Sequence, residues 1–523
     1  MKWLSKMLMV VAAAFSPAVA VAVSLHGLSW NMSKGAAISG STLTAEIKEA
    51  GGPQCAGKAE VDLSGMLGEG LGLVFTVRVR ATGVTKPNRP WNGVKFMLSY
   101  KDADTGKMHH PGATVPTGSY GWRVVTNRVN VLTAPVNPAD GKATIYLGLQ
   151  GCTGRVEFDL GSLSVFTEDV GVRPVNQDLV VKYPDSADRT RRRGCMLPER
   201  ETTEKDIADL AEWGATLGRF QIAHNWAAEN GDRDLAEYAD WVDSRLKNLE
   251  KVLRWAGARG MKIVVDLHSP PGGKRRVNGV RTMNMFFEAE YADAFVDTWR
   301  RIARRFKGNP ARYGYDLVNE PDHRAPVPFS YWELQRRAAE AIREIDPDAT
   351  IVVESNLSDN AEAFRYLSPL AMDNVVYQVH LYKPYEYTHQ GVWGNPTKMN
   401  GRPLAWPDTA RGWTAEHLRH VLAPVRAFQE KHGCRIYVGE FSAVSWAPGA
   451  EDYIRDCIAV FEEYGWDWTY HAFREWGAWS VEHDAVVPGR AGKDNFVPST
   501  DNPRKRALLE GLHRSYTTQK EMP

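Results

Sequence analysis

The sequence predicts an α/β protein of two parts, an all-β sandwich followed by a (β/α)8 TIM barrel. Three observations carry this prediction. The chain has 523 residues, which is more than one ordinary domain needs. Up to residue 168, short runs alternate between apolar and polar residues, and beyond residue 194 short apolar runs alternate with longer stretches of helical periodicity.

The first 22 residues have the pattern of a secretory signal peptide. Lys2 and Lys6 supply positive charge, an apolar stretch runs from Leu8 to Phe15, and small residues follow as a cleavage site. This stretch is too short to span a bilayer, and no later segment is apolar for long enough. We therefore expect a secreted protein, extracellular or periplasmic, with no integral membrane segment after signal cleavage.

Charge and composition exclude some classes of partner. The 64 basic and 63 acidic residues give a net charge of +1, so no basic excess points to nucleic acid. The 18 tryptophans suit a protein that stacks aromatic rings on sugars, but they equally suit the core of a large protein. We expect a monomer.

The five cysteines predict no metal centre. Cys195, Cys434 and Cys457 have neither C-x-x-C spacing nor a histidine at metal-ligand spacing, and we expect no metal and no cofactor. Cys55 and Cys152 lie in the N-terminal third, where they either pair with each other in an oxidising compartment or remain free.

Residues 24–168 are predicted to form the antiparallel sandwich. Period-two runs occupy 73–79, 94–100, 145–149 and 156–160, with Gly, Pro, Asn and Asp clusters between them.

In outline this domain resembles a carbohydrate-binding module. Its aromatic candidates for a ligand face are Trp30, Trp91, Tyr120 and Trp122. A scaffold that only packs on the barrel is the alternative.

Residues 169–193 form a polar linker, expected to wrap onto the second domain. It contains Pro174 and Pro184 and ends in three arginines, Arg191 to Arg193, which we expect to be solvated.

Residues 194–516 carry eight strand candidates separated by amphipathic stretches, as a (β/α)8 barrel requires. Thr203 and Asp206 resemble a capping pair in front of one predicted helix. The predicted strands are 194–196, 217–222, 262–267, 313–318, 350–354, 375–380, 435–438 and 468–472.

Polar or ionisable residues stand where these strands end, which is where barrel enzymes place their chemistry. Glu320 and Glu440 lie three strands apart, and such strands can bring their side chains together across the mouth of a barrel. Two neighbouring carboxyl groups cannot be equally acidic, so one can donate a proton while the other attacks. The strand-end residues are Arg219, Asp266-Leu267-His268, Asn319-Glu320-Pro321, His380-Leu381-Tyr382, Glu440 and Glu475-Trp476.

With these motifs, residues 194–516 resemble glycoside hydrolase family 5 of clan A, a family of cellulases, mannanases and related β-glycanases. The resemblance implies that Glu320 of Asn-Glu-Pro is the acid/base and that Glu440 is the nucleophile of a retaining, double-displacement glycoside hydrolase. It further implies supporting or substrate-binding roles for Arg219, His268, Asn319, His380, Tyr382 and Trp476.

Physical roles can be assigned to the supporting residues. Arg219 and Tyr382 can donate hydrogen bonds to Glu440 and keep it ionised, and Asn319 can bind the sugar 2-hydroxyl. The two histidines, His268 and His380, either orient the sugar or Glu320 or are structural.

Trp476 is expected to be a sugar platform, with a place in the core as the alternative. Asn225-Trp226 is a weaker candidate for the same cleft. Trp393, Trp406 and Trp413, in the loop after the sixth strand, either line distal sugar subsites or pack that loop down.

The predicted substrate is a polysaccharide or oligosaccharide, first of all a β-1,4-glucan of the cellulose type cleaved by endo action. The alternatives are a mannan, another β-glucan, or exo action on shorter glycosides, because loops set the sugar subsites. The Pro-Pro-Gly-Gly segment after His268 departs from a simple cellulase. A non-catalytic saccharide-binding protein would need neither glutamate, and a metal-dependent hydrolase would need more clustered ligands than the sequence offers.

Overall fold

A computed structural model describes the protein in two compact units, which divide between residues 169 and 170. The signal-peptide prediction for residues 1–22 falls almost entirely outside the described residues, as does the candidate Asn225-Trp226. The described residues are 22–67, 71–89, 91–101, 108–113, 115–129, 141–169, 175–184, 190–223, 234–277, 280–323, 327–399 and 401–513.

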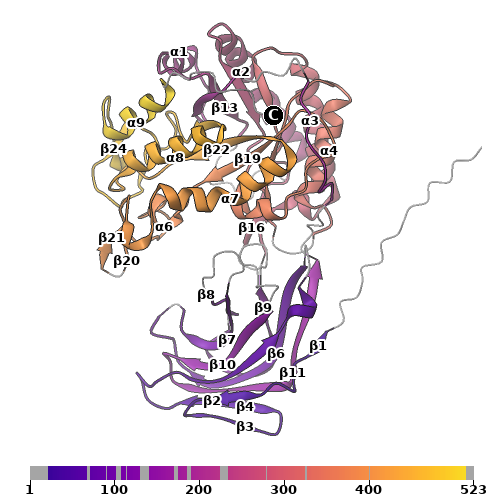
Figure 1. Ribbon diagram of the computed structural model, residues 1–523, viewed down its shortest axis with the longest axis vertical. Coiled ribbons are helices and arrows are strands. Elements are labelled where there is room, and N and C mark those ends of the chain that lie inside the picture. The colour runs from indigo at the N-terminus through magenta and orange to yellow at the C-terminus, as the bar shows by residue number, and fades with distance from the viewer. Residues whose placement is uncertain are drawn as a thin grey trace, which may run out of the picture. The chain divides into compact units, whose positions relative to one another are not determined.

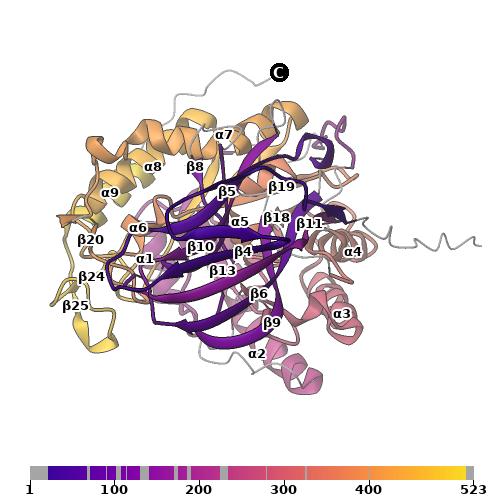
Figure 2. The same ribbon diagram turned by 90° about the horizontal axis from the view of Figure 1, so that it is seen from below.

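The first unit contains two antiparallel sheets, as the period-two runs predict (Figure 1). One sheet has the order β3-β4-β11-β6-β9, with β1 paired to β11, and the other has the order β2-β5-β10-β7-β8. Figure 2 shows strands of both sheets from below, among them β4, β6 and β9 of the first sheet and β5 and β10 of the second. Their bounds are β1 Val23–Ser24, β2 Trp30–Met32, β3 Ala36–Ser39, β4 Thr42–Ile47, β5 Cys55–Asp62, β6 Leu71–Val84, β7 Gly93–Lys101, β8 Met108–His109, β9 Gly118–Val129, β10 Lys142–Gln150 and β11 Gly154–Asp169.

Alternation along each strand builds the core of this unit. On β6, Val77 and Val79 are buried while Arg78 and Arg80 face solvent. Cys55 is buried and free, and so is Cys152. Cys55 stands opposite Leu149 in the β5–β10 register, whereas Cys152 lies beyond the end of β10, so the pairing considered from the sequence is not formed.

The second unit is a closed barrel of eight parallel strands, and each of them overlaps a strand predicted from the sequence. Every neighbouring pair is parallel, and β12 pairs with β23 to close the ring. In ring order the strands are β12 Arg193–Met196, β13 Leu217–Gln221, β14 Lys262–Asp266, β17 Arg312–Asp316, β18 Ile351–Glu354, β19 Val375–Leu381, β22 Arg435–Phe441 and β23 Asp467–Tyr470.

Helices lie around the outside of this barrel (Figure 1). The predicted cap of α1 is present, because Thr203 and Asp206 each accept the other's backbone N–H. In the part of the chain that is described, no helix is both long and apolar enough to cross a bilayer. The helices are α1 Glu204–Glu212, α2 Leu235–Gly257, α3 Ala289–Phe306, α4 Tyr331–Arg343, α5 Asn356–Asp359, α6 Tyr385–Thr388, α7 Ala415–His432, α8 Ala450–Tyr464 and α9 Pro503–Leu512.

Within the described parts of the barrel loops there are three short hairpins. They are antiparallel pairs, namely β15 Lys274–Val277 with β16 Val280–Met283, β20 Lys398–Met399 with β21 Arg402–Pro403, and β24 His483–Ala485 with β25 Phe496–Pro498.

Residues 175–184 of the predicted linker pack against the barrel unit. The Val181 amide donates to the His432 carbonyl at 2.8 Å, and the Tyr183 hydroxyl donates to the Val375 carbonyl at 2.6 Å. The expectation that the arginine run is solvated is wrong for Arg193. That residue is buried in β12 and bonds Glu462 at 2.7 Å, a partner far along the sequence that a local pattern cannot reveal.

The inside of the barrel changes from apolar to charged along the strands. Leu217, Val264, Val352 and Val376 form an apolar layer with the Tyr437 ring. Further along the same strands stand ionisable residues, so the carboxyl ends of the strands surround a polar mouth.

Candidate active site

Glu440 is held at the mouth of the barrel by two hydrogen-bond donors. Its Oε1 accepts a bond of 2.7 Å from Arg219 Nη1, and its Oε2 accepts a bond of 2.7 Å from the Tyr382 hydroxyl. Burial opposes ionisation of this carboxyl group, but the positive charges of His380, His471 and Arg219 prevail and hold its pKa well below the usual range. Glu440 is therefore a desolvated, ionised carboxylate with a fixed orientation.

Glu320 faces Glu440 across the mouth. A carboxylate oxygen of Glu320 and one of Glu440 lie within 4.8 Å of each other, and His380 contacts both residues. The side chain of Glu320 is 29% exposed, whereas that of Glu440 is 6% exposed. Two carboxyl groups this close match the spacing of about 5 Å in retaining glycosidases, where one attacks the sugar and the other exchanges the proton.

The backbone at Glu320 is strained. Its φ of +49° lies in the left-handed region, which costs a non-glycine residue about 1 kcal/mol or more. Glu320 stands immediately after Asn319, in the segment that follows the end of β17 at Asp316. Backbone strain of this kind persists only where surrounding contacts enforce it.

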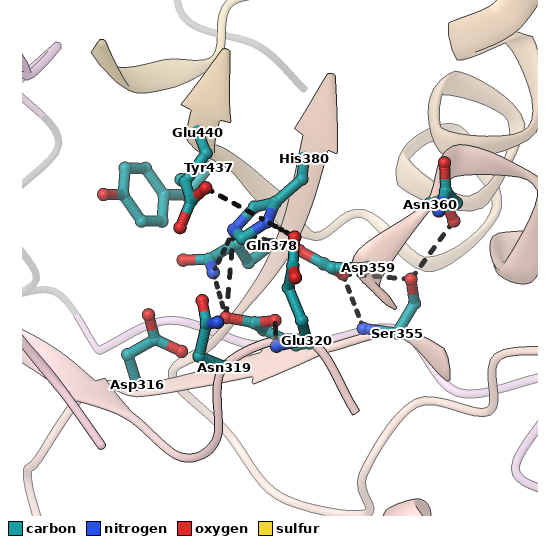
Figure 3. Close-up of polar contacts among 12 residues, drawn as sticks. Asp316, Asn319, Glu320, Ser355, Asp359, Asn360, Gln378, His380, Tyr437 and Glu440 are labelled. Carbon is teal, nitrogen blue, oxygen red and sulfur yellow. Dashed lines mark hydrogen bonds and ion pairs between the residues drawn. The ribbon is translucent and has the colours of Figure 1, made fainter. Parts of the chain in front are cut away.

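His380 bridges the two glutamates, as Figure 3 shows. Its Nδ1 lies 3.0 Å from Glu320 Oε1 and 3.8 Å from Glu440 Oε2. Burial favours the neutral imidazole, but the charges of Glu440 and Glu320 prevail and raise the pKa of His380 to about 9. At neutral pH an imidazolium therefore separates the two carboxyl groups.

We expect the charge on His380 to make the protein less stable at alkaline pH. Its folded pKa of about 9 exceeds the ordinary value of 6.5, so its contribution is complete below pH 6.5 and disappears as the pH rises through 9. The free energy of unfolding should fall by about 3 kcal/mol over this window. Denaturant titrations at several pH values, compared with His380→Asn, test this, and an equal fall in both proteins would contradict it.

Asn319 and His268 form a second polar group beside Arg219. Asn319 Oδ1 accepts a bond of 3.0 Å from Arg219 Nη2, and its amide nitrogen lies 3.2 Å from His268 Nε2. His268 Nδ1 in turn lies 2.9 Å from Asp266 Oδ2. Asn319 is thus fixed from two sides at the edge of the mouth, where it can meet a sugar hydroxyl.

From the sequence, Asp266 was named as a strand-end residue, but no role was given to it, to Asp316 or to Glu354, the acidic residues that surround Arg219. This arginine is fully buried, and its guanidinium contacts Asp316 at 2.9 Å, Glu354 at 2.9 Å and Asp266 at 3.3 Å. Burial raises the pKa of Asp316 to about 6 and that of Glu354 well above its usual range. Glu354 ends a fully buried strand, and that signal was available in the sequence.

His471 and Glu475 also belong to the site and were given no role from the sequence. His471 Nδ1 lies 3.3 Å from Glu440 Oε2, and its Nε2 lies 3.1 Å from Glu475 Oε1. Burial lowers the pKa of His471, but Glu440 and Glu475 raise it further, so the net shift is upward. His471 follows β23 directly, and its place at a strand end was the available signal.

These residues line a cavity of about 1000 Å³ with a strongly aromatic wall. Trp476 lines it and packs edge-on against Trp479 and Phe496, with ring centroids 5.4 Å and 6.2 Å away. All of the predicted site residues except Arg219 line this cavity, and Arg219 lies beneath it. The predicted residues in the lining are His268, Asn319, Glu320, His380, Tyr382, Glu440 and Trp476.

The three tryptophans of the loop after β19 separate into two kinds. Trp406 and Trp413 are buried and pack around the Tyr387 ring, so they hold the loop down. Trp393 is 66% exposed and lines the cavity. Its ring lies 5.5 Å from the ring of His389, which stacks on Tyr385 at 4.0 Å.

A parallel barrel with two facing glutamates at its mouth defines the protein as a glycoside hydrolase. The family model for cellulase (glycosyl hydrolase family 5) matches residues 187–476, and the chain belongs to this family. The expected resemblance is confirmed, and the match ends at Trp476, so the hairpin of β24 and β25 lies beyond it.

Two curated proteins and one solved structure illustrate what this chain is similar to. Endoglucanase C of Acetivibrio thermocellus is 27% identical over 296 residues, which are 51% of this chain and 83% of that protein. Cellodextrinase A of Ruminococcus flavefaciens is 27% identical over 278 residues, 52% of this chain and 79% of that protein. A solved structure of Thermotoga maritima Cel5A with cellobiose has a TM-score of 0.47 at 22% identity, and it covers 61% of this chain and 97% of that chain.

Proposed function

We propose that the protein is a retaining endo-acting glycoside hydrolase that cleaves a β-1,4-glucan by double displacement. The observation that carries this proposal is the pair Glu320 and Glu440, with carboxylate oxygens within 4.8 Å and an imidazolium between them. The names of the similar proteins, an endoglucanase and a cellodextrinase, support a β-glucan substrate.

In the first step Glu440 attacks the anomeric carbon while Glu320 donates its proton to the leaving glycosidic oxygen. A bond forms between Glu440 and the sugar as the bond to the leaving oxygen breaks. Arg219 and Tyr382 keep Glu440 ionised and aimed. Asn319 binds the 2-hydroxyl of the sugar, a contact that strengthens as the oxocarbenium-like transition state forms.

In the second step Glu320 takes a proton from water as that water attacks the anomeric carbon. The bond between the sugar and Glu440 breaks, and Glu440 leaves as a carboxylate. The anomeric configuration is retained because two displacements follow one another. The imidazolium of His380 lies beside both carboxyl groups and can stabilise each of them while it is charged. His268 orients Asn319.

The aromatic wall of the cavity provides the sugar platforms of this proposal. Trp476 is the platform for the reacting sugar. Trp393, together with the stacked rings of Tyr385 and His389, is the platform for a sugar farther along the chain. His389 suits a stack because burial lowers its pKa to about 3 and leaves the ring uncharged.

We further propose that the protein is secreted after removal of residues 1–22, and that it acts as a monomer. The sandwich domain, residues 24–168, is proposed to bind polysaccharide, although Trp30 and Tyr120 among its aromatic candidates pack against the core. Trp91 is the strongest candidate, because it is 68% exposed.

A panel of soluble and insoluble polysaccharides tests this substrate assignment. Endo action on β-1,4-glucan predicts that viscosity falls rapidly and that mixed oligosaccharides appear before monosaccharide or disaccharide accumulates. Activity confined to mannan, β-1,3-glucan or short glycosides would reassign the substrate. In the same panel, Trp91→Ala should reduce retention on insoluble glucan without changing turnover of a soluble oligosaccharide, and unchanged retention would favour a scaffold role.

A further inference from the structure

The carboxyl group of Glu354 lies beneath the two proposed catalytic glutamates and outside the cavity lining. Glu354 is the last residue of β18 and is fully buried. It does not line the cavity, so we assign it no contact with the sugar. Burying an acidic residue at this depth is costly unless its oxygens are well satisfied, and the partners of those oxygens reveal what the residue does.

One oxygen of Glu354 fixes the strained backbone of Glu320. Glu354 Oε2 accepts the backbone N–H of Glu320 at 2.6 Å. This peptide N–H belongs to the residue whose φ is +49°, so the bond stabilises a conformation that the chain would otherwise leave. The direction in which the Glu320 side chain leaves the backbone depends on that conformation, and its carboxylate then meets His380 Nδ1 at 3.0 Å.

The other oxygen of Glu354 fixes the arginine that holds Glu440. Glu354 Oε1 accepts a bond of 2.9 Å from Arg219 Nη2, and Arg219 Nη1 donates to Glu440 Oε1 at 2.7 Å. Because the guanidinium is planar and rigid, fixing one of its ends also fixes the other. One carboxyl group therefore connects the backbone of Glu320 to the side chain of Glu440.

Two glutamines fix Glu354 itself. The side chain of Gln335, on α4, donates to the Glu354 carbonyl at 2.8 Å and accepts the Glu354 N–H at 3.0 Å. Gln378, on β19, donates its amide to Glu354 Oε1. Gln378 also packs over Gly439, where an added Cβ would lie 2.5 Å from the Gln378 amide carbon, so the residue before Glu440 has no room for a side chain.

From these contacts we infer that Glu354 is a positioning residue, which sets the acid/base Glu320 and the nucleophile Glu440 in one rigid frame. The inference rests on the proposed function of that pair. It requires only that the two oxygens of Glu354 act as acceptors. A displacement of about 1 Å between reacting groups can cost a rate factor on the order of 100, so a frame that fixes both groups acts directly on turnover.

The test compares Glu354→Ala and Glu354→Gln with the wild-type protein on a soluble β-1,4-glucan and on 2,4-dinitrophenyl β-cellobioside. Glu354→Ala removes both acceptors and should lower kcat roughly 100-fold while KM changes less than about threefold. Glu354→Gln keeps one acceptor oxygen and should retain more of kcat. The loss should be larger on the glucan, because the activated aryl group leaves without help from a well-placed acid.

A matched control is Asp346→Asn, another buried acidic residue paired with an arginine. Asp346 bonds Arg312 at 2.6 Å at the start of β17, at the opposite end of the strands from the site. The Asp346→Asn substitution should lower the melting temperature. It should leave kcat on each substrate, and the ratio of the two kcat values, unchanged. If Glu354→Ala affects kcat no more than this control does, Glu354 has only a structural role and the inference is wrong.

A second variant keeps the inference testable if Glu354→Ala does not fold. Gln335→Leu removes both bonds to the Glu354 backbone without touching either catalytic glutamate, and it should lower kcat several-fold at unchanged KM. Wild-type kcat in this folded variant would overturn the inference. A wild-type protein inactive on both substrates would instead reject the proposed function.

Discussion

Replacing Glu440 with glutamine is expected to reduce kcat by roughly 10⁴-fold or more, as loss of a covalent nucleophile does in other enzymes. The amide has nearly the shape of the carboxylate but cannot form the glycosyl ester. Its oxygen can still accept the bond from Arg219, which now lies 2.7 Å from Glu440 Oε1, so the fold of the mouth should persist. Initial rates on a soluble β-1,4-glucan over a range of concentrations give kcat and KM separately.

The matched control for this variant is Glu463→Gln. Glu463 is an exposed glutamate on α8 that pairs with Arg419 at 2.8 Å, and its loss should change neither kinetic constant. Circular dichroism and thermal unfolding establish that both variants are folded. Activity within tenfold of the wild type in folded Glu440→Gln would show that the nucleophile has been misassigned.

Replacing Glu320 with glutamine is expected to have an effect that depends on the leaving group. Cleavage of the glucan should slow about 10²- to 10⁴-fold, which is the usual contribution of general acid–base catalysis. An activated aryl cellobioside needs no proton to leave, so its first step should stay fast. The second step should then become slow, because no base activates water.

Stopped-flow measurements on 2,4-dinitrophenyl β-cellobioside test this separation of steps. We expect a burst of dinitrophenol equal to the enzyme concentration, followed by slow turnover. Azide is a nucleophile that needs no base, so it should restore turnover and give the β-glycosyl azide. Equal losses on both substrates with no burst would remove Glu320 from the acid/base role.

The barrel could be predicted from local sequence because its signals are local. Each strand is a short apolar run that ends in a polar residue, as at Glu320 and Glu440, and the helices between them carry apolar stripes. The capping pair at the start of α1 lies within four residues and needs no tertiary information. The same reasoning brought eight candidate residues to one place, because the carboxyl ends of parallel strands meet at one mouth: seven line the cavity and Arg219 contacts Glu440.

The remaining site residues depend on contacts between distant segments. Glu354 ends its strand as plainly as Glu320 follows its own, but its importance lies in partners 34 and 135 residues away. The buried ion pair of Arg193 joins residues 269 apart, so a local pattern indicated a solvated arginine instead. Hydrophobic periodicity predicts which face of a helix or strand is buried. It does not predict which distant polar group pairs with a polar side chain on that buried face.

The side chains of the long loops were equally beyond local reasoning. One loop contains three tryptophans, Trp393, Trp406 and Trp413, which a local sequence pattern cannot tell apart. Only their packing shows that Trp393 is an exposed part of the cavity wall, whereas the other two are buried and support the loop. Substrate choice depends on such loop residues, which is why the sequence predicts the bond-breaking chemistry more closely than the sugar.

The most direct test of the paired glutamates is to trap the covalent intermediate. In a 2-deoxy-2-fluoro-β-cellobioside the fluorine slows both steps, because it destabilises both oxocarbenium-like transition states. A good leaving group keeps the first step fast enough for the glycosyl–enzyme to accumulate. Intact-protein mass spectrometry should then show an increase of one fluorocellobiosyl group, and peptide mapping should place it on Glu440. No adduct, together with a product of inverted configuration, or an adduct on any other residue, would contradict the mechanism.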